Sequence, residues 1–384
     1  MIYFDNAATT LRKPDGVVQA ITAALSSFGG AGRGVHRASL AAGRAVFEAR
    51  ERIADLLGAP SANTIAFTSN ATMALNCALQ GLIKPGSTVV TTAASHNSVL
   101  RPLFRLRDEA GCKIEIIPIF PDGSLDFATY EQVLSCSEVA LVAATHASNV
   151  TGDVYNVARM VRLAHEAGAL FVLDAAQTAG SYPFSLKDLN ADVVCFTGHK
   201  SLGGPQGTGG LYVDPSLEIH PLIEGGSGIH SFDERHPRFM PEALEAGTLN
   251  AHGLAGLAAG VAFLQEVGVD TVHKYLVALT DLCKEELHLC EGVRIVGGNN
   301  SFDRCGIVAL QAQGIDSSAL ADMLAQDFDI CTRAGAHCAP LMHKSLGTQE
   351  CGVVRLSFSY FNTEEEVRQT IQALRHCLNE LRCA

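Results

Sequence analysis

The chain has 384 residues, of which 47% are hydrophobic and 18% are charged. This composition is typical of a globular protein and excludes a disordered one, and the length exceeds what one core usually supports, so we expect two domains. The formal charge of −12 at pH 7 would repel a phosphate backbone, which argues against a nucleic-acid-binding protein.

The start "MIYFDN" lacks the basic and apolar regions of a signal peptide, and the longest apolar run, near Leu254 to Leu264, is too short to cross a bilayer. The twelve cysteines are never closer than six positions, so no C-x-x-C pair exists. Most of them lie in apolar segments and resemble small buried hydrophobic residues in a reducing compartment. We therefore expect a soluble, cytoplasmic protein that neither spans nor binds a membrane.

From about residue 16 to 215, short apolar runs alternate with amphipathic stretches such as 40–59, 71–81 and 155–167. The apolar runs predict seven strands, at 63–69, 87–93, 113–119, 139–149, 170–177, 192–198 and 209–214. This alternation is typical of an α/β fold, here a mostly parallel seven-stranded sheet with helices on both faces. Ligands of such sheets bind at the carboxyl ends of the strands.

The second half of the chain has a different order of predicted helices and strands. A helical region, about 252–290, precedes a second set of strands at 294–298, 306–314 and 353–362. The chain then ends in a helix that Thr363 and Glu366 are expected to open with a capping box. This pattern predicts a smaller α+β domain, and we assign 16–264 to the large domain and 1–15 with 265–384 to the small one.

Polar residues follow the predicted strands of the large domain. Asp174 ends one strand in "LFVLDAAQ", and His199 and Lys200 follow the next strand in "TGHK". Burying the carboxylate costs several kcal/mol unless a cation meets it. The pair predicts either a buried salt bridge or a pyridoxal phosphate (PLP) site, in which the lysine binds the aldehyde and the aspartate keeps the pyridine nitrogen protonated. Asn149 and Gln177, also at strand ends, could reach the cofactor ring hydroxyl or the substrate.

The stretch "FTSNATMALN" is a candidate phosphate site, because a helix begins near Ala71 directly after a strand. Free backbone N–H groups there, with the side chains of Asn70 and Thr72, can bind a phosphate. The same residues would also serve as an ordinary N-cap. Thr197, three residues before the lysine, is a second phosphate donor.

Taken together, these segments give the chain a resemblance to the fold-type I, class V aminotransferase-like enzymes. Within them it is most similar to the cysteine desulfurases and selenocysteine lyases. The matching segments occur in the expected order over nearly the whole chain: "YFDNAATT", "TSNAT", "SHNSV", "HASNVTG", "LDAAQ", "TGHK", "EAGTLN" and "RAGAHCAPL".

The resemblance implies a role for each matching residue. Lys200 would bind PLP covalently, Asp174 would pair with the ring nitrogen and Gln177 would bond the ring oxygen. His96 would stack on the ring and assist proton transfer. Thr248 in "EAGT" would reach the phosphate bound by the other subunit, which implies an obligate homodimer. The phosphate would be held by Ala71, Thr72, Thr197 and His199.

Cys338 lies in a loop of small residues beside His337, five positions after Arg333. A partly exposed thiol near positive charge ionises readily, and the thiolate is the nucleophile. The alternatives are a loop cysteine without a role, or a metal site made with His337 and His343, which would lack a fourth ligand. The resemblance, here to the short-loop, SufS-like branch, implies that Cys338 attacks the substrate sulfur, and we expect no metal.

Two arginines are candidates for binding the substrate. The resemblance implies that Arg355 binds the substrate carboxylate through a bidentate fork, assisted by Arg333 and Asn149. A buried structural arginine is the alternative. His36, in "GRGVHRAS", would either line the entrance or be an exposed loop histidine.

The implied reaction converts L-cysteine to L-alanine. Lys200 removes the α-proton, and the sulfur stays on Cys338 as a persulfide for a sulfur-acceptor protein. Selenocysteine lyase, another C–S lyase, an aminotransferase and a non-catalytic scaffold remain alternatives, and the pathway remains open. The chain departs from the family pattern at two places. Many relatives carry an acidic residue and a second histidine where this chain has Ala94 and Ser95, and the segment after Cys338 is compact here, with Pro340 only two positions further on.

Overall fold

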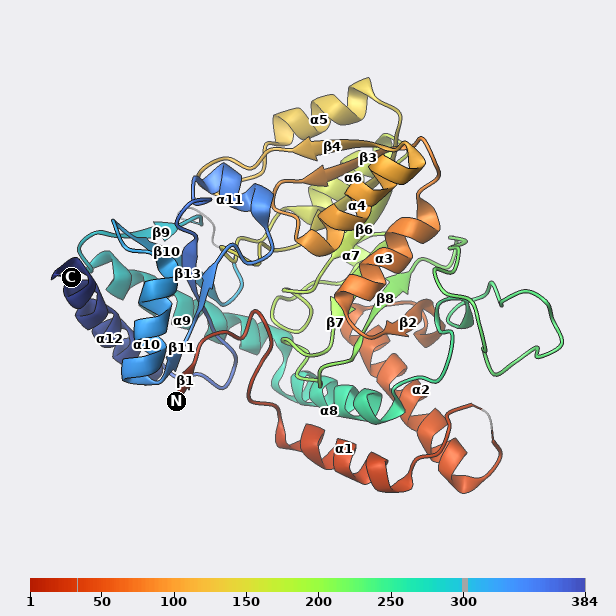
Figure 1. Cartoon of the computed structure of the whole chain (residues 1–384). Helices are drawn as coiled ribbons and strands as arrows, with labels where there is room; N and C mark the ends of the chain where they lie inside the picture. Colours follow the sequence, from red (N-terminus) through yellow and green to blue (C-terminus); the bar gives the residue numbers. More distant parts are fainter. Residues whose placement is uncertain (33, 299–302, 384) are drawn as a thin grey trace.

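The computed structural model describes residues 1–32, 34–298 and 303–383 (Figure 1). Its large sheet has seven strands in the order β2-β8-β7-β6-β5-β3-β4, and β8 alone runs antiparallel to both of its neighbours. The predicted, mostly parallel seven-stranded sheet is therefore confirmed. Every strand falls inside its predicted range: β2 (Ile65–Thr68), β3 (Thr88–Thr92), β4 (Lys113–Ile117), β5 (Val139–Thr145), β6 (Leu170–Asp174), β7 (Val193–Thr197) and β8 (Gly209–Val213).

Helices cover both faces of the large sheet, and the strand β6 shows how. Val172 belongs to one apolar cluster, in which α3 (Ala71–Leu82) packs, whereas its neighbours Phe171 and Leu173 belong to another, which includes α6 (Val157–Glu166). Because side chains alternate along a strand, continuous apolar runs are needed to bury both faces. The remaining helices around this sheet are α1 (Asp15–Ser27), α2 (Arg37–Leu57), α4 (Asn97–Ala110), α5 (Phe127–Cys136), α7 (Leu186–Leu189) and α8 (Ala251–Val267).

The smaller sheet is antiparallel, with the order β12-β13-β10-β9. Its strands are β9 (Val293–Val296), β10 (Ile307–Ala312), β12 (Arg333–Gly335) and β13 (Val353–Ser357). Three of them match the prediction. Strand β12 was not predicted, and neither was the parallel pair of β1 (Ile2–Tyr3) with β11 (Ile330–Cys331), because strands of two or three residues carry no readable periodicity.

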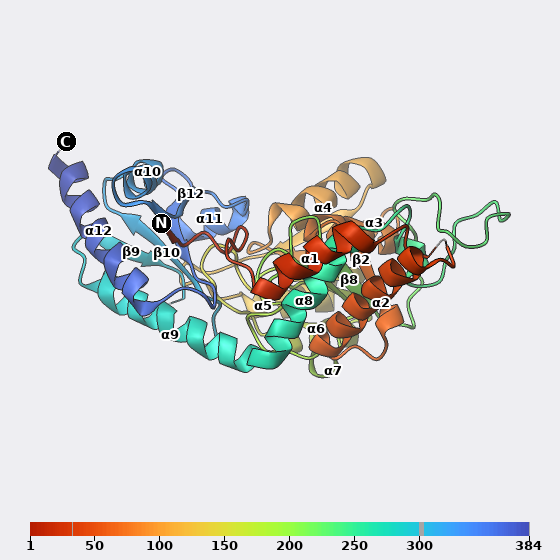
Figure 2. The same ribbon diagram turned by 90° about the horizontal axis from the view of Figure 1, so that it is seen from below.

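The helical region of 252–290 is two helices rather than one. Helix α8 ends at Gly268, whose φ of 86° lies outside the helical region, and α9 (Val269–His288) continues at 81° to it. Figure 2 shows the pair leading from the large sheet to the small one. The other helices of this part are α10 (Ser317–Phe328), α11 (Pro340–Leu346) and α12 (Glu364–Cys383). The domain boundaries near residues 15 and 265 stay a prediction.

Helix α12 opens with the predicted capping box. The Glu366 N–H donates to Thr363 Oγ1 at 3.2 Å, and the Thr363 N–H donates to Glu366 Oε2 at 2.9 Å. Within the described ranges, no single helix is long and apolar enough to cross a membrane. In the same ranges, the bent pair α8–α9 meets the length and composition requirement when its two helices are taken together.

Candidate active site

A cavity of about 220 Å³ lies at the carboxyl ends of β5, β6 and β7, and residues of the small sheet also line it. This is the edge where parallel sheets bind ligands. Twelve of the predicted site residues line the cavity: Ala71, Thr72, His96, Asn149, Asp174, Gln177, Thr197, His199, Lys200, Arg333, Cys338 and Arg355.

Asp174 and Lys200 share the floor of this cavity without forming an ion pair with each other in the described structure. Asp174 ends β6 and accepts a hydrogen bond from the Ala176 N–H at 3.0 Å. Burial raises the pKa of Asp174 and lowers the pKa of Lys200 to about 8. The attraction of Asp174 opposes the shift at Lys200, while the charges of Arg355 and Arg333 add to it. A buried amine that loses its proton this readily is suited to act as a base.

The phosphate end of the candidate cofactor site lies at the start of α3. Asn70 is the N-cap, and its Oδ1 accepts from the Met73 N–H at 3.0 Å, so its cap role is confirmed. The first N–H groups of a helix have no intrahelical acceptor, which leaves those at Ala71 and Thr72 for a ligand. Across the described residues, Thr197 Oγ1 and His199 Nδ1 are buried without a hydrogen-bond partner. An anionic ligand would supply the acceptor that buried donors of this kind require.

These observations test the fit of PLP. Its phosphate would find unpartnered donors at Thr197 and the start of α3, and its ring nitrogen would find the buried carboxyl of Asp174. Its aldehyde would find the buried amine of Lys200. The residues present therefore fit the cofactor.

His96 is the N-cap of α4, and a serine that the sequence interpretation missed fixes its ring. The Ser98 N–H donates to His96 Nδ1 at 3.0 Å, and Ser98 Oγ lies 2.9 Å from the same nitrogen. A neutral ring that accepts at Nδ1 carries its proton on Nε2. Burial and then the charge of Lys200 lower the pKa of His96 to about 4, so the ring is neutral. Ser98 Oγ also lies 2.7 Å from Thr72 Oγ1, which links the histidine to the phosphate end.

The loop between β12 and α11 carries Cys338, whose side chain is exposed. His337 and Cys338 have φ values of 50° and 56°, in the left-handed region that few residues other than glycine adopt. The large-sheet part of the chain holds this backbone: Asn149 Nδ2 donates to the His337 carbonyl at 2.7 Å, and the Asn97 N–H donates to the Cys338 carbonyl at 2.8 Å. The thiol thus lies at the cavity on a loop that two hydrogen bonds from the large-sheet part hold in place.

His337 does not supply the positive charge that we expected beside the thiol. Burial lowers the pKa of His337 to about 3, with the charge of Arg355 as the next cause, so its ring is neutral. Its Nε2 lies 3.1 Å from the Arg333 carbonyl, and its ring stacks on that of His343 at 5.9 Å. No group of three or more possible metal ligands occurs in the described ranges. The absence of a metal stays a prediction.

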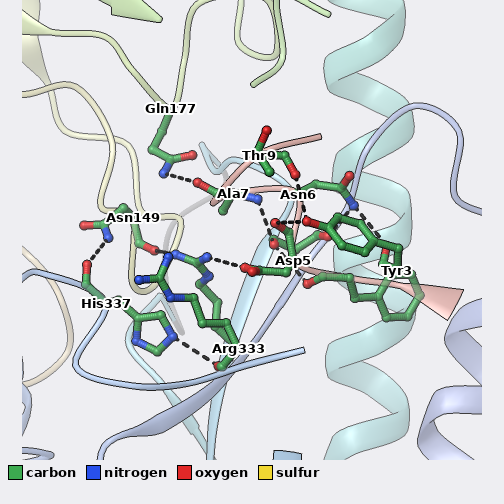
Figure 3. A network of polar contacts seen from close by, with 12 residues as sticks. Tyr3, Asp5, Asn6, Ala7, Thr9, Asn149, Gln177, Arg333 and His337 are labelled. Atoms are coloured by element: carbon green, nitrogen blue, oxygen red, sulfur yellow. Dashed lines mark hydrogen bonds and ion pairs between the residues drawn. The ribbon is translucent and has the colours of Figure 1, made fainter. Parts of the chain in front are cut away.

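Arg355 is buried, with 1% of its surface exposed, and an acid from the other end of the chain meets it. Its Nη2 lies 2.7 Å from Asp5 Oδ1, and its Nη1 donates to the Asn149 carbonyl at 2.8 Å. Figure 3 shows Asp5 and Asn149 on two sides of this network. Arg333 is the register partner of Arg355 across β12 and β13.

The N-terminal segment also holds the peptide that precedes Lys200. The His199 carbonyl accepts from the Thr10 N–H at 3.1 Å, Thr9 Oγ1 at 3.2 Å and Lys13 Nζ at 2.9 Å. Burial lowers the pKa of Lys13 to about 8. The resemblance included "YFDNAATT", but the sequence alone gave no indication of where these side chains point.

Two predicted residues lie outside the cavity. Thr248 lines a separate cavity of about 250 Å³ together with Phe67 and Leu254. His36 is the exposed N-cap of α2, and its Nδ1 accepts from the Ser39 N–H at 3.4 Å. Gln177, inside the active-site cavity, donates from Nε2 to the Ala7 carbonyl at 3.1 Å.

Comparison with known proteins shows the family of the chain. The model of the class-V aminotransferase family matches residues 2–370, and the chain belongs to that family. It is 34% identical over 390 residues to a probable cysteine desulfurase of Pyrococcus abyssi, covering 100% of this chain and 95% of the relative. It is 31% identical over 392 residues to the cysteine desulfurase CsdA of Escherichia coli, covering 99% and 94%. Within the family, the chain is an enzyme of the cysteine desulfurase kind.

Solved structures confirm the fold type. The cysteine desulfurase of Thermococcus onnurineus NA1 superimposes with a TM-score of 0.93 at 36% identity, covering 99% of this chain and 95% of that one. The S-sulfonic acid form of CsdA from Escherichia coli superimposes with a TM-score of 0.89 at 30% identity, covering 99% and 95%.

Proposed function

We propose that this protein is a PLP-dependent cysteine desulfurase that converts L-cysteine to L-alanine and holds the sulfur as a persulfide on Cys338. The observation that carries the proposal is the composition of one cavity. A half-buried lysine with its pKa lowered to about 8 and a buried aspartate share it with an exposed cysteine on a fixed loop. The family and its named desulfurase relatives support the same assignment.

The residues divide the work. PLP, when bound, supplies a sink for the electron pair at the substrate α-carbon. Asp174 would hold the proton on the ring nitrogen, and the donors at Ala71, Thr72, Thr197 and His199 would hold the phosphate. Gln177 and Asn149 would bond the ring oxygen or the substrate. Lys200 would hold the aldehyde and, once released from it, take the α-proton.

Cys338 would accept the sulfur from the substrate. Its thiolate attacks the substrate sulfur, so an S–S bond forms while the Cβ–S bond breaks, and the electron pair stays with the carbon. A proton then completes the alanine methyl group, and His96, with its Nε2–H, would assist proton movement. Arg355 and Arg333 would bind the substrate carboxylate during these steps. Because the Cys338 side chain is exposed, a sulfur-acceptor protein could reach the persulfide.

The active protein would be a cytoplasmic homodimer, with Thr248 reaching the phosphate bound by the partner. Large apolar side chains that remain exposed on the single chain support an interface. They lie on α1, on α2 and in the segment 223–239 that precedes Thr248 in the chain: Val18, Leu25, Phe47, Ile223, Phe232 and Phe239.

Product analysis tests the proposal. PLP-loaded protein would be incubated with cysteine or selenocysteine and a reductant, and alanine, sulfide and selenide would be measured. We expect alanine and sulfide in equal amounts, no turnover by Lys200→Ala, and loss of sulfide release by Cys338→Ala with the cofactor still bound. Cys351→Ala removes another exposed thiol, outside the cavity, and should behave as the wild type. Turnover of selenocysteine alone, or sulfide release that survives Cys338→Ala, would contradict the proposal.

A further inference from the structure

The side chain proposed to bind the substrate carboxylate already binds a carboxylate of its own chain. Arg355 is almost fully buried, and Asp5 Oδ1 lies 2.7 Å from its Nη2. Burial lowers the pKa of Arg355, and the charge of Asp5 is the largest influence that opposes this shift. A buried cation without an acid is costly, so Asp5 stabilises the arginine in place.

Asp5 is itself held by a dense set of main-chain contacts. It forms an isolated parallel bridge with Ser357, two residues beyond Arg355 on β13. Its carbonyl accepts from the Ala8 N–H at 3.1 Å and from the Tyr3 hydroxyl at 3.3 Å. Figure 3 shows Tyr3 and Asn6 around this turn, and Asn6 Nδ2 donates to the Ser357 carbonyl at 2.9 Å. The carboxylate therefore projects from a fixed point of the small sheet.

The guanidinium uses only part of its capacity on the protein. Arginine has five N–H donors in a rigid plane. Asp5 takes one at Nη2, the Asn149 carbonyl takes one at Nη1, and Nε is buried without a partner in the described structure. Two acceptors from different parts of the chain thus set the plane, and three donors remain in a residue that lines the cavity. A bidentate carboxylate needs two of them.

Charge gives a second reason for an acid at this point. Arg333 and Arg355 are register partners on adjacent strands, an arrangement that is unfavourable for like charges. In the described ranges Asp5 is the only acid that forms an ion pair with either of them. Asp5 thus leaves one net positive charge at the place where a single substrate carboxylate would bind.

We propose that Asp5 is a positioning residue for the substrate: it fixes the guanidinium of Arg355 in the orientation that receives the amino-acid carboxylate. The inference rests on the proposed role of Arg355. It makes the N-terminal segment part of the substrate site, although Asp5 itself would act only through the arginine.

Steady-state kinetics with L-cysteine tests this role. In Asp5→Ala the arginine loses one of its two anchors, so we expect KM to rise at least about tenfold with kcat within about threefold of the wild type. Asp5→Asn keeps an oxygen that accepts from Nη2 but loses the negative charge, so its KM should lie between those of Asp5→Ala and the wild type. A lower KM in Asp5→Ala would mean that Asp5 competes with the substrate, and an unchanged KM would mean a structural role only; both results overturn the proposal.

Two further variants separate this inference from the proposed function. Arg355→Ala should raise KM more than Asp5→Ala does, and the double variant should match Arg355→Ala alone, because Asp5 acts through the arginine. If Arg355→Ala leaves KM unchanged, the proposed role of Arg355 fails; if it raises KM and Asp5→Ala does not, only the role of Asp5 fails. Asp316→Ala, which removes an acid that caps α10 and does not line the cavity, serves as the matched control, with KM within about twofold.

Discussion

The two sides of the cavity are built differently. On the large-sheet side, Asp174, Lys200 and His96 are buried or nearly so, and burial is the largest cause of each pKa shift. On the small-sheet side, Cys338 is exposed on a loop with left-handed backbone. Arg355, which lines the same cavity, is buried and forms an ion pair with Asp5 of the N-terminal segment.

This difference matches two kinds of chemistry. Electron withdrawal by a cofactor profits from a dry site, where charges interact strongly and fixed groups need no rearrangement. Handing sulfur to another protein requires a thiol that the partner can reach. The large sheet therefore provides the groups proposed to meet the cofactor, and the small sheet provides the exposed thiol together with the buried Arg355. Variants on each side should show this division.

Among variants that keep Lys200 and Cys338, the largest effect on activity is expected from Asp174→Ala. This variant would remove the carboxylate proposed to keep the ring nitrogen of bound PLP protonated. Losing one partner of such a buried pair costs on the order of 3–5 kcal/mol, so kcat/KM should fall by about a hundredfold or more. The matched control is Asp192→Asn, at the opposite edge of the same sheet. Asp192 Oδ2 lies 2.9 Å from His165 Nε2 and accepts from the Phe171 N–H at 2.6 Å. This control should lose stability and keep its kinetics; equal losses of kcat/KM in the two variants would contradict the division.

Lys200→Met should make the cofactor-free protein more stable. Burial lowers the pKa of Lys200 from 10.5 to about 8, so burying the charged amine costs about 3 kcal/mol below pH 8. Between pH 8 and 10.5 the unfolded chain binds the proton that the folded chain has lost, and wild-type stability rises with pH. Urea unfolding should therefore show a gain at pH 7 that shrinks toward pH 10. The exposed Lys84→Met is the control, and a gain that is independent of pH would refute the assignment.

Much of this arrangement was readable from the sequence. The runs "LFVLDAAQ" and "DVVCFTG" predict buried strands, and neighbouring parallel strands put their carboxyl ends at one edge. The predicted proximity of Asp174 and Lys200 is confirmed, because both line one cavity. The capping box at Thr363 was predicted from two letters because its contacts are local.

The contacts that could not be predicted are distant or conformational. Asp5 and Arg355 are 350 positions apart, and no local sequence pattern predicts their ion pair. The left-handed backbone at Cys338 involves no glycine at that position. Ser98, two residues after His96, reads as an ordinary residue of a helix start, and only the fold places its hydroxyl between Thr72 and the imidazole.

Ser98→Ala should reduce activity less than Asp174→Ala does, and the free-energy change should be smaller than the one expected for Lys200→Met. It removes one neutral hydrogen bond to His96 Nδ1 and the contact with Thr72 Oγ1, and it keeps the backbone N–H that also binds this nitrogen. A bond of this kind contributes about 1 kcal/mol, so kcat should fall by about three- to tenfold, and cofactor affinity should fall by no more than that. Ser98→Thr retains the hydroxyl and should recover most of the loss. A hundredfold decrease, or a kcat that does not change at all, would remove Ser98 from the site.

The smallest effect on catalysis should come from Thr363→Ala, on the small-sheet side but far along the chain from the cavity loop. Thr363 Oγ1 accepts the Glu366 N–H at the start of α12, and losing such a cap costs about 1 kcal/mol of stability. The loss should appear in thermal or urea unfolding, while kcat and KM for cysteine stay at wild-type values. The small sheet would then serve catalysis only through the groups it brings to the cavity, such as Arg355 and Cys338. If Thr363→Ala instead changed KM as Asp5→Ala is expected to, the stability of the small domain itself would govern substrate binding, and the specific role given to Asp5 would lose its support.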